Sequence, residues 1–79
     1  MDWTPENIYL LRRHIGDTQG QFAERVGLKR RQTVSDWEVG KIIPGGITRK
    51  LLDVIANDHG FTERVAARLR EKLKRDEGE

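Results

Sequence analysis

The sequence has no cysteine, and it has no hydrophobic run that approaches the ~20 residues needed to span a membrane. The missing cysteines exclude a disulfide framework and a thiolate metal site, and they fit a reducing compartment. The opening residues, MDWTPEN, do not resemble a secretory signal. We therefore expect a cytoplasmic protein.

An excess of charge of one sign is also missing, although charged residues are abundant. Fifteen Lys and Arg face thirteen Asp and Glu, which gives a formal net charge of +2 at pH 7. That value alone does not indicate a nucleic-acid partner, so the distribution of the charges has to decide. Most of the cations are arginine. Two explanations fit the excess of arginine over lysine. Arginine can serve as a bidentate donor to phosphates and guanine edges, or it can simply be the preferred surface cation.

At 79 residues the chain fits one domain with a small core. We place that domain at residues 1–75 and expect 76–79 to fray. Hydrophobic periodicity and capping signals predict a compact all-α fold with no strand. The five expected helices occupy residues 4–16, 17–27, 31–40, 48–60 and 62–79.

Threonine marks the expected start of four of these helices. Thr4 precedes a proline that suits the first helical position. Thr18 and Gln21 have the spacing of a capping box. Thr48 and Thr62 are the expected N-caps of the last two helices.

Apolar residues at helical spacing define the expected core. In the first four helices these are Ile8, Leu11, Ile15, Phe22, Ala23, Val26, Val34, Trp37, Leu51, Leu52 and Ile55. The last helix has an apolar stripe that fits either packing onto the domain or a dimer interface, made of Val65, Leu69 and Leu73. Three residues near the start of the chain fit either a cover for the last helix or an exposed patch for a partner: Trp3, Tyr9 and Leu10.

Residues that would support catalysis or metal binding are scarce. His14 and His59 have no further metal ligand at a suitable spacing. No Ser–His–Asp set, paired carboxylates or phosphate-binding glycine loop can be identified. We therefore expect no cofactor, no metal site and no enzymatic activity.

Residues 18–40 contain a short helix, a tight turn at Gly27 and a helix with a polar outer face. This is the helix-turn-helix pattern, in which the second helix lies in the major groove of DNA. Such a helix needs apolar anchors on one face, here Val34 and Trp37. It needs hydrogen-bonding side chains on the other face, here Arg31, Gln32, Ser35 and Asp36.

The stretches TQGQFAERVG and TVSDWEVGKIIP resemble the lambda-repressor-like helix-turn-helix family of the Cro/cI or XRE type. The similarity runs from about residue 8 to about residue 61, and it implies a five-helix DNA-binding domain. It implies that Arg31, Gln32 and Asp36 face the bases and that Thr33 and Ser35 are flanking contacts. It also implies that Gln19 binds a phosphate and braces the recognition helix, that Lys41 meets the DNA backbone, and that an internal salt bridge joins Arg12 and Glu38.

The chemistry of the residues agrees with several of these roles. Arg31 can donate two hydrogen bonds to guanine, and Gln32 can pair with adenine. Each such bidentate contact is worth about 1–3 kcal/mol of discrimination. Lys29, Arg30 and Lys41 suit phosphates, which fix position without reading sequence.

Asp36 is unusual on a surface that meets DNA, because phosphates repel a carboxylate. It can accept a hydrogen bond from cytosine N4. It can instead hold Arg31 or Gln32 in position, or it can be a solvated side chain without a role.

The sequence departs from the pattern of the family at the start of the third helix. Arg30 occupies the expected N-cap position, and arginine cannot accept a hydrogen bond from the free backbone amides. The turn is also one residue longer than the resemblance implies, near Lys29 and Arg30. Either Arg30 or Arg31 is therefore the residue that reads the DNA.

These observations predict a sequence-specific, double-stranded DNA-binding transcriptional regulator, a repressor, which inserts residues 31–39 into the major groove. We expect a nucleoid-associated homodimer, at least on DNA, with half-sites about 34 Å apart. The alternative is an antitoxin-like or other protein-binding partner that uses the same fold.

Overall fold

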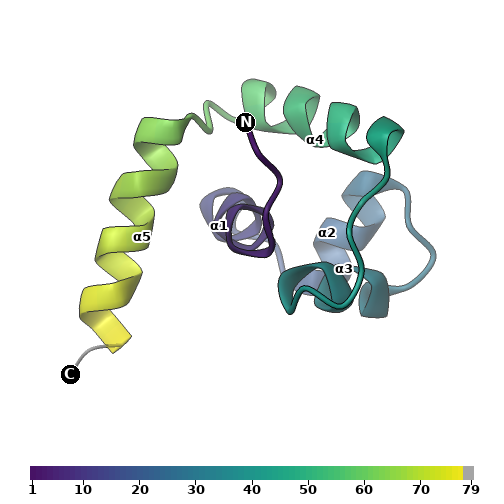
Figure 1. Cartoon of the computed structure of the whole chain (residues 1–79), viewed down its shortest axis with the longest axis horizontal. Coiled ribbons are helices and arrows are strands. Elements are labelled where there is room, and N and C mark those ends of the chain that lie inside the picture. The colour runs from purple at the N-terminus through teal and green to yellow at the C-terminus, as the bar shows by residue number, and fades with distance from the viewer. Residues whose placement is uncertain (78–79) are drawn as a thin grey trace.

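The structure, a computed structural model, describes residues 1–77, which form five α-helices and no strand (Figure 1). The predicted all-α, five-helix architecture is confirmed. The last helix continues through residues 76–77, past the expected domain end, and residues 78–79 of the expected frayed tail lie outside the described part. The helices are α1 (Pro5–Ile15), α2 (Gln19–Val26), α3 (Arg31–Glu38), α4 (Gly46–Asp58) and α5 (Glu63–Glu77).

The helices surround one small core, and α1 lies in the middle of the arrangement. In Figure 1, α1 is seen end-on between α5 and the α2–α3 pair, while α4 runs across the top. Helix α1 packs against α3 and α5, and α2 packs against α3 and α4. The buried apolar side chains are Trp3, Ile8, Leu10, Leu11, Phe22, Ala23, Val26, Val34, Trp37, Leu52, Ile55, Ala56, Phe61 and Ala66.

Three of the four predicted threonine caps are confirmed. The Thr4 hydroxyl accepts a hydrogen bond from the backbone N–H of Asn7 at 3.1 Å. Thr18 and Gln21 form the predicted capping box. The Thr62 hydroxyl accepts from a backbone N–H of the first turn of α5 at 3.2 Å.

The predicted start of α4 is wrong. The helix begins at Gly46, its N-cap is Gly45, and Thr48 lies half-buried in the first turn. Glycine and threonine are similarly good N-caps, so local preference did not distinguish them. The start is set instead by the buried Pro44, whose carbonyl oxygen accepts a hydrogen bond from Nη1 of Arg49 at 2.9 Å.

The predicted inner face of α4 is wrong for one residue. Leu52 is fully buried and Ile55 is nearly so, but Leu51 is 38% exposed. Adjacent residues of a helix are rotated by about 100°, and the buried stripe is centred near Leu52 because Ala56 extends it on the side away from Leu51. Leu51 therefore joins Ile47 in an exposed row along the outside of α4.

The N-terminal segment belongs to the core. Trp3 is 6% exposed, its Nε1 donates to Oδ1 of Asp53 at 2.8 Å, and its ring stacks on Phe61. Leu10 is buried, and Tyr9 packs against the core. The interpretation as an exposed patch is therefore wrong for Trp3 and Leu10.

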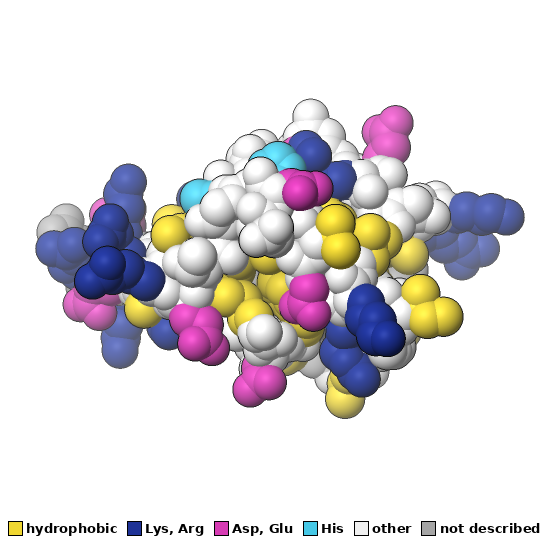
Figure 2. Space-filling model, turned by 90° about the horizontal axis from the view of Figure 1, so that it is seen from above, with side chains coloured by type: hydrophobic (Ala, Val, Ile, Leu, Met, Phe, Trp, Pro, Cys, Tyr) yellow, Lys and Arg dark blue, Asp and Glu magenta, His cyan; other side chains and the backbone are white. Residues whose placement is uncertain are grey.

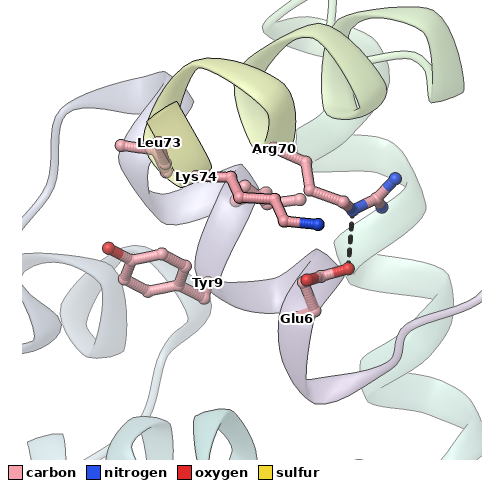
Figure 3. Close-up of a pocket in the computed structure, with 6 residues that line it drawn as sticks. Glu6, Tyr9, Arg70, Leu73 and Lys74 are labelled. Atoms are coloured by element: carbon pink, nitrogen blue, oxygen red, sulfur yellow. Dashed lines mark hydrogen bonds and ion pairs between the residues drawn. The ribbon is translucent and has the colours of Figure 1, made fainter. Parts of the chain in front are cut away.

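Helix α5 is held against α1 by apolar and charged contacts. Its three stripe residues, Val65, Leu69 and Leu73, are partly buried against the core, as expected for packing onto the domain. Beside this stripe, Nε of Arg70 donates to Oε1 of Glu6 at 2.6 Å (Figure 3). At the other end of α1, Nε2 of His14 and the carbonyl oxygen of His59 are 2.7 Å apart.

The two neighbouring leucines of α4 provide a test of this core. Replacing the fully buried Leu52 by alanine is expected to lower the free energy of unfolding by about 2–5 kcal/mol. Leu51→Ala is the matched control and is expected to cost less than about 1 kcal/mol, because its side chain is partly exposed. Urea unfolding followed by circular dichroism measures both, and equal losses would contradict this assignment of the inner face.

Candidate nucleic-acid interface

The turn between α2 and α3 is built around Gly27, whose φ of 85° lies in the left-handed region. Its N–H donates to Glu24 O, and the N–H of Leu28 donates to Ala23 O at 2.8 Å. This pair of bonds ends a helix in the Schellman arrangement, which favours glycine at the left-handed position. Leu28 then packs against the core, and this contact fixes the position of the chain shortly before α3 begins.

Helix α3 begins at Arg31, and the extra residue of the turn stays outside it. Arg30 is extended, with φ −132° and ψ 133°, and its side chain makes no capping hydrogen bond. Residues 28–30 are not helical. Arg31 is therefore the first side chain on the helix, and Lys29 and Arg30 belong to the turn.

The outer face of α3 consists of two rows of side chains, because residues four apart lie on the same side of a helix. Arg31 and Ser35 form one row, and Gln32 and Asp36 form the other. Arg31 and Gln32 are exposed, while Ser35 and Asp36 are half-buried. Thr33 is also half-buried and lies off these rows.

The carboxylate of Asp36 holds the neighbouring amide. Nε2 of Gln32 donates to Oδ1 of Asp36 at 3.0 Å. This hydrogen bond agrees with the interpretation in which Asp36 positions Gln32. An amide NH₂ has two hydrogens, so Gln32 keeps one donor and its carbonyl oxygen for a further partner.

A hydrogen-bonded network connects α3 to α1 and α2. Nε and Nη2 of Arg12 donate to the two carboxylate oxygens of Glu38 at 2.7 and 3.0 Å. Nε2 of Gln19 donates to Oε1 of the same carboxylate at 3.2 Å. Nη1 of Arg12 donates to the carbonyl oxygen of Asp17 at 3.1 Å.

The network is largely shielded from water, with side-chain exposures of 13% for Arg12 and 8% for Glu38. Hydrogen bonding to Glu38 raises the pKa of Arg12 above its ordinary value, although burial acts in the opposite direction. Arg12 therefore keeps its proton, and its positive charge lies directly against the Glu38 carboxylate inside the domain. The outer face of α3 is therefore less negative than the presence of Glu38 in its sequence suggests.

Four cations surround the outer face of α3. Lys29 and Arg30 lie in the turn before it, Arg31 begins it, and Lys41 follows it, and all four are exposed. None of them takes part in an ion pair with another residue among 1–77. In Figure 2, Lys and Arg side chains gather over α5 at one end of the molecule and near the α2–α3 turn at the other.

Sequence reasoning missed the apolar side chains beside this surface. Val39 is the C-cap of α3 and is 72% exposed. Ile43, in the loop that follows, is 76% exposed. The signal that identifies Val39 is its position four residues after Ser35 and seven after Gln32, which places it between the two rows of the outer face.

Other kinds of site find no support in the described residues. Across residues 1–77, no group of three or more His, Cys, Asp or Glu side chains is placed to hold a metal ion. No helix in this part of the chain is long and apolar enough to cross a membrane.

A protein-family model described as helix-turn-helix matches residues 8–54. The chain belongs to this helix-turn-helix family. The matched segment contains most of α1, all of α2 and α3, and most of α4, which are the elements that build and orient the outer face of α3. The family is of the lambda-repressor-like, XRE type, and its members are DNA-binding regulatory domains. Comparisons with the curated proteins and with the solved structures give no match.

The network of the helix-turn-helix domain can be tested with two glutamates of different exposure. Glu38→Gln is expected to lower the free energy of unfolding by about 2–3 kcal/mol, because it leaves the shielded guanidinium of Arg12 without its anion. Glu6→Gln breaks a second Arg–Glu pair, but both partners are exposed, so the loss should stay below about 1 kcal/mol. Urea denaturation of the two variants gives the comparison, and a Glu38 effect no larger than the Glu6 effect would refute the structural role of the network.

Proposed function

We propose that this protein is a sequence-specific transcriptional repressor that inserts α3 into the major groove of double-stranded DNA. The observation that carries the proposal is the division of α3 into two faces. Val34 and Trp37 fix its inner face in the core, while hydrogen-bonding side chains occupy its outer face. A recognition helix needs both properties.

In this proposal the first turn of α3 reads the bases. The guanidinium group of Arg31 donates two hydrogen bonds, to O6 and N7 of a guanine. Gln32 pairs with adenine through its carbonyl oxygen and the N–H that Asp36 leaves free. Ser35 and Asp36, one turn further along the same face, complete the set of base-contacting residues, and Asp36 can accept from cytosine N4 through the oxygen that Gln32 leaves free.

The phosphate contacts come from both sides of α3. Lys29 and Arg30 precede it and Lys41 follows it, so their charges straddle the groove that the helix enters. Thr33 adds a neutral contact to the DNA backbone. Gln19 is half-buried at the start of α2, where it already braces Glu38 and is expected to donate its remaining amide hydrogen to a phosphate.

We further propose that two copies bind one operator in the cytoplasm, on half-sites about 34 Å apart, and that occupancy blocks transcription. Two-fold symmetry places both recognition helices on one side of the duplex. Selection of bound sequences from random duplex DNA tests this directly, because it yields the half-site, its symmetry and its spacing. Failure to enrich any sequence would rule out sequence-specific binding.

A protein-binding role of the antitoxin type, with the same fold, is the second candidate. It is favoured by an exposed aliphatic row on the outside of α4, where Ile47 is 88% exposed and Val54 56% exposed. Contiguous apolar surface of this kind is typical of protein-interaction sites. Specific DNA binding by the isolated chain would exclude a role that depends on a protein partner.

The salt dependence of binding should report the phosphate contacts. The logarithm of the affinity is expected to fall linearly with the logarithm of the salt concentration, with a slope of about −0.9 for each phosphate neutralised. Three cations per copy, Lys29, Arg30 and Lys41, give a slope of about −3 for one copy and about −5 for two. Gel-shift titrations between 50 and 200 mM salt are a suitable measurement, and a slope near zero would contradict the mechanism.

Two substitutions should separate base reading from phosphate binding. Arg31→Ala is expected to weaken the selected site by about 1–3 kcal/mol and to relax the preference at one base pair. Lys41→Ala should weaken all sequences alike and make the salt slope shallower by about 1 per copy. Fluorescence anisotropy with the selected duplex and with single-base variants distinguishes the two effects. Indifference to both substitutions would favour the protein-binding candidate.

A further inference from the structure

One apolar side chain lies on the face of α3 that we propose reads DNA. The N–H of Val39 donates to Ser35 O at 3.1 Å, so Val39 still follows the helical path although it is the C-cap. It lies four residues after Ser35 and seven after Gln32, between the two rows of the outer face. Its side chain is 72% exposed.

Val39 points away from the core and does not serve as an anchor. At about 100° per residue, it is rotated by about 140° from Val34 and by about 160° from Trp37. Both of those side chains are buried, with exposures of 0% and 3%. The direction opposite the two anchors is the middle of the outer face, between the rows that begin at Arg31 and at Gln32.

The outer face therefore changes chemistry along its length. Its first turn presents hydrogen-bonding groups, and its end presents a branched aliphatic side chain with no polar atom. From Arg31 to Val39 the helix rises about 12 Å, which corresponds to a few base pairs of DNA. Val39 therefore faces a different base pair from Arg31.

We infer that Val39 contacts the C5-methyl group of a thymine and makes thymine a specified base of the half-site. The inference rests on the proposed function. The methyl group of thymine is the apolar feature of the base-edge pattern in the major groove. An exposed valine gains little from phosphates or from polar base edges, but it gains from excluding water beside a methyl group.

Removing single methyl groups from the DNA tests the inference. In the duplex selected from random sequences, each thymine of one half-site is replaced in turn by deoxyuridine, which pairs identically but lacks the methyl group. At one position the replacement is expected to lower the affinity of the unchanged protein by about three- to fivefold. This is the factor that corresponds to the loss of one buried methyl group. With Val39→Ala the same replacement should change the affinity by less than about 1.5-fold, because the methyl group has lost its partner.

Ile47→Ala is the matched control, because it also shortens an exposed β-branched residue but lies on α4. It should keep the full sensitivity to deoxyuridine. Circular dichroism melting checks that both variants fold as the unchanged protein does. If no thymine is sensitive, or if Val39→Ala remains as sensitive as the unchanged protein, the inference is wrong. The proposed function still stands in that case if a sequence was enriched and Arg31→Ala relaxes it, and it falls together with the inference if no sequence is enriched.

Discussion

The ion pair between Arg12 and Glu38 is the interaction on which the orientation of the outer face depends. It joins the last turn of α1 to the last residue of α3, and Gln19 adds the first residue of α2. Three helices thus converge on one carboxylate. A helix of eight residues has little stability of its own, so its direction is set by such tertiary contacts.

The same pair also shapes the electrostatics of the surface. Glu38 is neutralised inside the domain by Arg12, whereas the hydrogen bond from the neutral amide of Gln32 positions Asp36 but leaves its charge in place. The cations of the turn and of the following loop remain unpaired within the described chain. A chain with a net charge of only +2 can therefore present a locally positive face.

Local signals were sufficient for much of the fold. The capping box of Thr18 and Gln21 lies within four residues, so neighbouring sequence alone predicts it. The start of α4 was mispredicted because Gly45 and Thr48 are comparable caps, and the choice between them depends on burial of Pro44. The position of Trp3 depends on Asp53, fifty residues away, which no local pattern can indicate.

The interface shows the same division between local and long-range information. The polar residues of α3 are evident from helical spacing, whereas the partner of Glu38 was implied by the family resemblance and not by any pattern near it. Val39 was overlooked because apolar residues were considered only as core, and its exposure becomes visible once Val34 and Trp37 fix the rotation of the helix.

Arg30 places the demands of folding and of DNA binding in opposition. As an N-cap without a side-chain acceptor it gives the first amides of α3 no capping hydrogen bond, and a serine or aspartate there would add about 1 kcal/mol of helix stability. An aspartate would also bring a negative charge to the entrance of the proposed DNA groove. In the proposed mode of binding, a cation at this position favours the DNA backbone at the expense of the stability of the helix start.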